Sequence, residues 1–209
     1  NAFLDEFAWQ EGVRVTLGCL MDCTNGFELS YTGPFDWERQ GTATSNGNLD
    51  SLLRPSDGYT FNDVDTFFNA DLQTVDVRSH LQSIEANYRW WVWDVFSTMI
   101  GIRYMDYEED YAFFSSGANG AGLHIEGVDN QLAGIQVGAD MLYPTGLRCN
   151  TGVRGKAGAY ANLSERRSFL VNDGTLLINS GASNTDWAAM FEFGWFANYY
   201  VLPRFRVSA

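Results

Sequence analysis

The stretch from Leu147 to Leu163 alternates two kinds of residue along its whole length. Odd positions such as Val153 and Ala157 are apolar or small, whereas even positions such as Arg154 and Lys156 are polar or glycine. A period of two places successive side chains on opposite faces of a β-strand. The alternation runs about two to three times the ~5 to 6 residues of an ordinary soluble strand. It therefore predicts a long strand whose two faces meet different surroundings.

The same alternation recurs along the chain and predicts about eight strands. Short breaks follow every second strand, at Asp22–Gly26, Trp91–Asp94, Pro144–Gly146 and Tyr200–Pro203. The intervening stretches lose the alternation and collect acidic and small residues, and we expect them to be long acidic loops: Glu38–Leu72, Asp106–Gly122 and Ser164–Asn184. Short turns at one end and long loops at the other are typical of an outer-membrane barrel. The predicted fold is an all-β, antiparallel, up-and-down transmembrane β-barrel.

The chain divides into a lead-in segment, residues 1–10, and one β-barrel domain, residues 11–209. The formal net charge of −13 disfavours a nucleic-acid partner, because phosphate binding needs a basic surface. No apolar run reaches the ~18 residues of a membrane-spanning helix. Composition thus leaves strands as the only predicted route across a membrane.

The bulk of the side chains decides which face of the sheet is inside. The interior of an eight-stranded barrel is just wide enough for side chains to fill, so large rings belong outside, and glycines with charges of both signs belong inside. Unpaired charges would be costly there, so we expect a hydrogen-bonded network. The predicted lumen charge network is Arg14, Glu28, Glu85, Arg103, Arg154, Lys156 and Glu192. The predicted lipid-facing surface and aromatic girdle are Trp37, Trp90, Trp91, Trp93, Phe96, Tyr143, Phe191, Phe193, Trp195 and Tyr199.

Four short sequence words carry a resemblance to a known family: Gly12–Gly18, Ser83–Tyr88, Ile100–Tyr104 and Asp129–Gly138. Over residues 12–209 the chain resembles the β-barrel porin family described in planctomycete-type bacteria. The resemblance implies an outer-membrane barrel with a porin role. One departure is the last stretch, which ends in Ala209 where such barrels usually have a terminal aromatic residue. The last strand is therefore expected to be incomplete.

The expected function is that of a structural or anchoring barrel with a side-chain-filled lumen, located in the cell outer membrane. Its expected partners are outer-membrane lipids and other copies of the chain or a larger envelope assembly. A porin-like channel for small solutes and a secreted water-soluble β-barrel or sandwich are the alternatives. Catalysis is not expected, because His80 and His124, near Asp76, Ser79 and Glu126, show no diagnostic spacing.

No cofactor is expected. Asp57, Asp63 and Asp65 offer the oxygen ligands that calcium prefers, but they lack the full spaced pattern with a closing Glu, so a solvated acidic loop is the main expectation. The cysteines follow no metal-binding pattern, and free thiols or one disulfide fit equally: Cys19, Cys23 and Cys149.

Overall fold

One antiparallel sheet contains all the strands of the computed structural model, which describes residues 11–51, 61–202 and 205–208. The strands follow each other in sequence order across the sheet. They are β1 (Arg14–Leu20), β2 (Asn25–Leu49), β3 (Ala70–Trp93), β4 (Phe96–Gly117), β5 (Gly120–Pro144), β6 (Cys149–Asn172), β7 (Thr175–Leu202) and β8 (Phe205–Ser208). The predicted all-β, up-and-down order is confirmed. The predicted lead-in segment lies outside the described residues.

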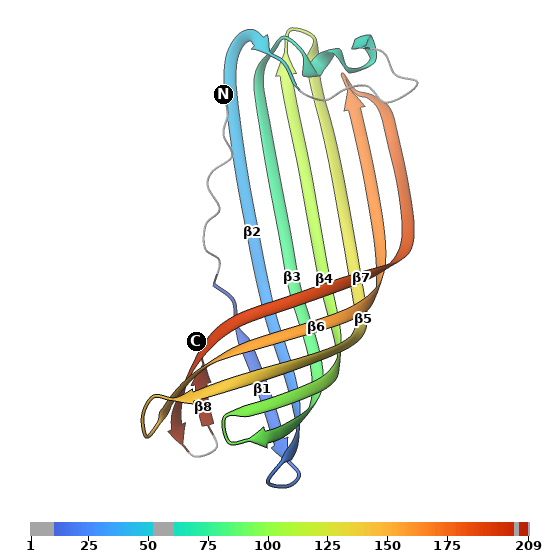
Figure 1. The fold of residues 1–209 in the computed structure, drawn as a ribbon. Coiled ribbons are helices and arrows are strands. Elements are labelled where there is room, and N and C mark those ends of the chain that lie inside the picture. The colour runs from blue at the N-terminus through green and yellow to red at the C-terminus, as the bar shows by residue number, and fades with distance from the viewer. Residues whose placement is uncertain (1–10, 52–60, 203–204, 209) are drawn as a thin grey trace.

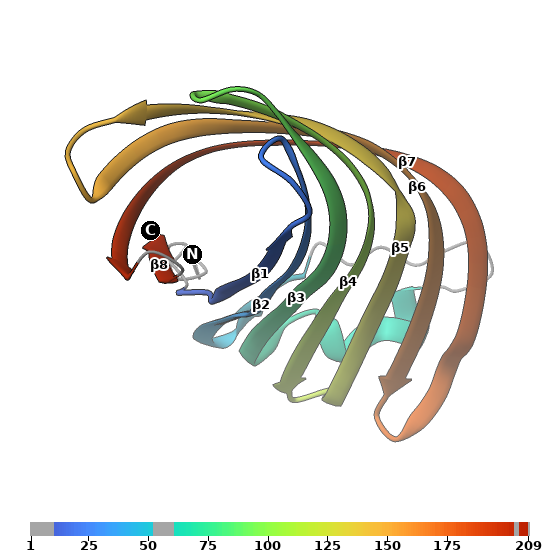
Figure 2. The same ribbon diagram turned by 90° about the horizontal axis from the view of Figure 1, so that it is seen from below.

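The sheet curls into a half-barrel, as the view from below shows (Figure 2). A right-handed twist between neighbouring strands produces such curling in long antiparallel sheets. Within the described residues, no backbone pairing joins β1 to β8, so these strands are the edges of the sheet. Among the same residues, no helix has both the length and the apolar character needed to cross a membrane.

Two of the three predicted long acidic loops, Asp106–Gly122 and Ser164–Asn184, are wrong, and the third, Glu38–Leu72, is shorter than predicted because β2 continues to Leu49. Residues 106–122 and 164–184 are mostly strand, and tight turns join β4 to β5 at Ala118–Asn119 and β6 to β7 at Asp173–Gly174. Between the described strands, the one long connection joins β2 to β3 and contains the 3-10 helix η1 (Phe61–Phe67). Backbone groups alone make the ladder hydrogen bonds, so a strand continues where both of its faces are polar. The lost alternation therefore marks a change in surroundings and not the end of a strand.

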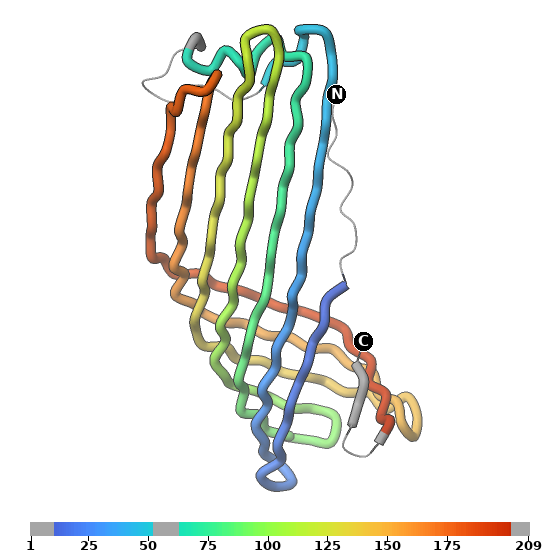
Figure 3. Tube along the Cα trace, turned by 180° about the vertical axis from the view of Figure 1, so that it is seen from behind, coloured from blue at the N-terminus to red at the C-terminus, as the bar shows by residue number. Residues whose placement is uncertain are grey.

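The long strands β2 to β7 lie side by side and bend part of the way along their length (Figure 1, Figure 3). One row of directly paired residues crosses all of them: Tyr31, Ile84, Tyr104, Ala133, Ala161 and Trp187. We call the segments between this row and the β1–β2, β3–β4 and β5–β6 turns the lower part of the sheet. The upper part runs from this row to the β4–β5 and β6–β7 turns.

Among the described residues, most of the buried apolar side chains belong to two small clusters. Met105, Leu132 and Tyr160 form one of them, close to the middle of the strands. The other lies at the upper end, where Val64 and Phe67 of η1 pack against side chains of β4 and β6. Most of the lower part contains no apolar core, which directs attention to the polar residues buried there.

Candidate functional site

The lower part of the sheet buries its polar face and exposes its apolar face. Phe191, Phe193 and Trp195 of β7 are 83%, 77% and 86% exposed. On the opposite face, Glu85 and Lys156 are 3% and 5% exposed. This distribution is the reverse of that in water-soluble domains, where Lys and Glu are almost never fully buried unless they are paired.

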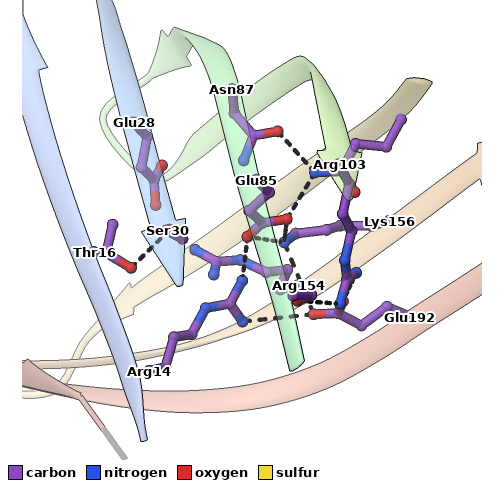
Figure 4. Close-up of polar contacts among 12 residues, drawn as sticks. Arg14, Thr16, Glu28, Ser30, Glu85, Asn87, Arg103, Arg154, Lys156 and Glu192 are labelled. Carbon is purple, nitrogen blue, oxygen red and sulfur yellow. Dashed lines mark hydrogen bonds and ion pairs between the residues drawn. The ribbon is translucent and has the colours of Figure 1, made fainter. Parts of the chain in front are cut away.

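Glu85 lies at the centre of one half of a charge network (Figure 4). Its carboxylate accepts hydrogen bonds from Lys156 Nζ at 2.7 and 2.8 Å, from Arg14 Nη2 at 2.5 Å and from Gln136 Nε2 at 2.7 Å. The Glu192 carboxylate accepts a bond from Arg103 Nη1 at 2.7 Å and lies 3.6 Å from Arg14 Nη1. These contacts connect six strands, β1 and β3 to β7.

Arg89 lies at the centre of the other half. Its guanidinium donates from Nε to Glu28 at 2.8 Å, and from Nη1 to Asp140 and to Ser97 at 2.7 Å each. Arg154 donates to the same Asp140 carboxylate at 2.8 and 2.7 Å. Each carboxylate of the network therefore has at least one cation beside it, as buried charges require.

The structure brings together every residue predicted for the lumen charge network, and it adds Arg89 and Asp140. Both added residues lie in phase with predicted members, because Arg89 follows Glu85 by four positions and Asp140 pairs directly with Arg154. The alternation along the sequence places both residues on the same face as the predicted members and could have identified them. The ion-pair partners of Arg89 and Asp140 could not be predicted, because these pairs join strands far apart in the chain.

The network can form only on a concave face. Neighbouring strands in a sheet are about 4.8 Å apart, so β1 and β7 of a flat sheet would be far beyond the reach of side chains. Arg14 of β1 nevertheless lies 3.6 Å from Glu192 of β7, and Lys156 of β6 lies 2.7 Å from Glu85 of β3. We therefore call the face with Glu85 the inner face and the opposite face the outer face.

Glycines on the inner face provide space for the network and for the Tyr160 ring. A Cβ at Gly134 would collide with the carbonyl oxygen of Ala159 and lie 2.8 Å from Tyr160 Cδ1, whereas a Cβ at Gly155 on the outer face would meet no atom within 4 Å. We expect Gly134→Ala to destabilise the fold by about 1–3 kcal/mol through overpacking. Gly155→Ala should be neutral or stabilising by up to about 1 kcal/mol. Urea unfolding of both variants tests this, and equal effects would contradict it.

Most of the predicted aromatic girdle lies on the outer face, but two residues do not. Trp37 pairs with Ser79 in phase with Glu85, and Trp91 pairs with Ser97, so both rings lie on the inner face. Trp37 faces inward because β2 has a bulge at Gly33 (φ +124°) and the next residue. The bulge adds one residue to β2, so each residue after it lies on the face opposite to the one that simple alternation predicts. The remaining residues lie on the outer face: Trp90, Trp93, Phe96, Tyr143, Phe191, Phe193, Trp195 and Tyr199.

The outer face changes character at the row that separates the two parts of the sheet. On and below this row its side chains are apolar or aromatic on every strand from β2 to β7, apart from Asn25 at the start of β2 and a few small residues. Two rows higher, the same face carries Asp36, His80, Glu108, Asp129 and Glu165. The apolar surface is thus a continuous band with a sharp upper border.

The histidines considered for catalysis lie apart on opposite faces. His80 lies on the outer face with its Nδ1 2.6 Å from Asp36, and its neighbour Ser79 faces inward, so the two side chains cannot act on one substrate. His124 lies on the inner face, 3.6 Å from Glu126. Nothing in these contacts assembles a nucleophile with a base.

The calcium candidates have other contacts or lie outside the described residues. Asp57 belongs to the undescribed residues 52–60, and the Asp65 carboxylate accepts a hydrogen bond from Asn172 at 2.9 Å. On the outer face, the carboxylates of Asp106, Glu108 and Asp129 lie within 4.8 Å of one another. The cysteines are free and exposed, so no disulfide forms: Cys19, Cys23 and Cys149.

Two side chains outside the apolar band have strongly shifted pKa values. Hydrogen bonds from Asn25 and Thr24 lower the pKa of the Asp22 carboxyl in the β1–β2 turn to about 2. Burial and a hydrogen bond to Glu109 raise the pKa of Tyr107 to about 12. Asp22 therefore stays ionised and fixes the turn, and Tyr107 stays protonated, at any ordinary pH.

No family model, curated protein or solved structure matches this chain.

What the charge network can do chemically follows from how its charged side chains are paired. Because each carboxylate of the network is held by cations, the network ties distant strands to each other and presents no free acid or base. The network crosses the concave face of the half-barrel, from Arg14 of β1 to Glu192 of β7.

Proposed function

We propose that this chain forms the wall of an outer-membrane β-barrel and that the charge network fills its lumen, so that it acts as a structural or anchoring barrel. The observation that carries the proposal is the reversed burial in the lower part, where Phe193 and Trp195 face outward and Glu85, Arg89 and Lys156 are enclosed. In water, such an apolar band would be a very large exposed patch, and large patches of this kind mark membrane or protein contacts.

The length of the apolar band supports a membrane position. A tilted strand needs about 9–11 residues to cross the hydrocarbon of a bilayer. On β6 the apolar or small outer positions run from Cys149 to Leu163, and on β7 they run from Trp187 to Val201. Both runs suffice for a crossing. The acidic rows above the border then lie in water, which accounts for strands that continue beyond the band.

Two layers of side chains on the inner face support a plugged lumen. The charge network forms the first layer. The second lies above it, where Met105, Leu132 and Tyr160 pack together with 9%, 9% and 1% of their surfaces exposed. A solute moving along the interior would have to break ion pairs and then open an apolar layer.

Single-channel recording on planar bilayers tests the plugged lumen. We expect no conductance steps after insertion of the protein, and conductance steps at the nanosiemens scale would contradict the proposal.

Quenching of tryptophan fluorescence by brominated lipids tests the membrane position separately. Trp195 should be quenched in vesicles, and the Trp195→Phe variant should lose that part of the quenching.

A porin-like channel is the second candidate, and the open sheet favours it. Because β1 and β8 are unpaired edges in the described residues, a barrel closed by further strands would be wider and would separate Arg14 from Glu192. Free edges are not tolerated in hydrocarbon, so the proposed barrel must pair them. Conductance in the same bilayer experiment distinguishes the channel from the plugged barrel.

A further inference from the structure

We propose that His124 is a pH-dependent latch for η1: neutral His124 lets η1 stay docked on the inner face of the upper part, and protonation of His124 releases it. The proposal does not depend on insertion into a membrane. It begins with the position of His124 beside the apolar cluster at the upper end of the sheet.

His124 lies between the two side chains on which η1 packs. Val64 and Phe67 of η1 are 1% and 0% exposed and cluster with Phe113 of β4 and Leu170 of β6. His124 of β5 pairs directly with both Phe113 and Leu170, so the three side chains form one row on the inner face.

The Phe67 ring reaches the same place. A Cβ on Gly122 would meet Phe67 Cζ at 2.7 Å, so the ring lies directly over this glycine. Gly122 is the next inner-face position to His124 along β5. The His124 imidazole therefore borders the surface that η1 covers.

The surroundings of the ring suit a neutral imidazole. His124 Nδ1 is buried and has no hydrogen-bond partner among the described residues. The ring meets Tyr111 edge-on, with the centroids 6.2 Å apart. A proton added here would bring a charge and an unpaired donor among apolar side chains, and burial of either is costly.

The charged groups around His124 do not fully compensate such a charge. Glu126 of β5 lies 3.6 Å from Nε2, but its carboxylate already accepts a bond from Arg166 of β6 at 2.7 Å. Tyr111 of β4 is neutral at ordinary pH because burial raises its pKa. The acidic groups of η1 are Asp63 and Asp65, and the Asp65 carboxylate is bonded to Asn172.

These groups fix the sign of the pH dependence. Burial lowers the pKa of His124 below its ordinary value, Glu126 opposes this shift, and Arg166 adds to it. Docking of η1 is therefore strongest above the pKa of an exposed histidine, about 6.5. It weakens as the pH falls below that value, by up to about tenfold in the docking equilibrium per pH unit, until the pKa of the docked form is passed.

Hydrogen exchange of the η1 backbone amides between pH 7.5 and pH 5 tests the latch, on the full chain and after correction for the intrinsic pH dependence of exchange. Protection of η1 in the unmodified chain should fall by up to about tenfold per pH unit below about 6.5. His124→Phe should abolish this fall. His80→Gln is the matched control, because the chain has only two histidines and His80 lies on the outer face beside Asp36. The control should behave like the unmodified chain.

If η1 in His124→Phe loses as much protection between pH 7.5 and pH 5 as η1 in the unmodified chain, the proposal is overturned. If that variant does not fold, exchange of the imidazole C2 proton in the unmodified chain gives the pKa of His124 directly. A value below about 6.5 supports the latch, and a value at or above it overturns the proposal.

Discussion

Arg89→Met should destabilise the folded chain by about 3–5 kcal/mol, the usual result of removing one partner from a buried ion pair. Arg89 is 6% exposed and connects Glu28, Asp140 and Ser97. Asp140 would keep Arg154, but Glu28 would be left enclosed beside an apolar side chain. Urea unfolding in detergent micelles or lipid vesicles, followed by tryptophan fluorescence, measures the effect.

Two further variants separate charge from packing. Arg78→Met removes an arginine whose side chain is 63% exposed, so its effect should stay below about 1 kcal/mol. Adding Glu28→Gln to Arg89→Met removes the stranded charge, so the double variant should be more stable than the sum of the single changes predicts, by about 1–3 kcal/mol. Equal destabilisation by Arg89→Met and Arg78→Met would show that the network does not hold the strands together.

Sequence reasoning found the lower part because its two faces have different surroundings. From Leu147 to Leu163, each second residue is apolar and each other residue is small or polar, and this contrast reveals both the strand and its faces. The same contrast identified Glu85, Lys156 and Glu192 as members of one face. The partner of each charge could not be predicted, because Arg14 reaches Glu85 and Glu192 only once the sheet has curled.

The strands of the upper part were not predicted, because polar residues occupy both of their faces and the alternation is lost. Only the turns kept a signal, in the dipeptides Asn119-Gly120 and Asp173-Gly174. Such dipeptides favour tight hairpins because they adopt positive φ, as Asp173, Gly174 and Gly120 do at +45°, +77° and +101°. Reading them as turns would have converted two predicted loops into hairpins.

The reversed position of Trp37 has a different cause. An added residue in a strand exchanges the faces of everything beyond it, and periodicity does not show which residue is added. Gly33 followed by Pro34 is a plausible place for such a bulge in any strand, yet the apolar character of Phe35 and Trp37 continued the expected outer phase. Only the pairing of Phe35 with Leu81 reveals the exchange.

Phe193→Arg should have an effect whose size depends on what covers the outer face. Phe193 is 77% exposed near the middle of the apolar run of β7 and pairs with Gly155. In a bilayer, an arginine at this depth should destabilise the barrel by about 2–4 kcal/mol. In water, exchange of an exposed ring for arginine changes stability by only about 0.5 kcal/mol in either direction. Urea unfolding from lipid vesicles and the share of protein in the membrane fraction both measure the result.

Ser183→Arg is the matched control for Phe193→Arg on the same strand and the same face. Ser183 lies above the border of the apolar band and pairs with Glu165, so an arginine there meets water and a carboxylate and should change stability by less than about 0.5 kcal/mol. The difference between the two arginine variants therefore reports the hydrocarbon around Phe193 and not the chemistry of arginine. If Phe193→Arg instead stays as stable as its control and dissolves without detergent, the apolar band faces water or another protein, and the secreted soluble fold replaces the membrane barrel.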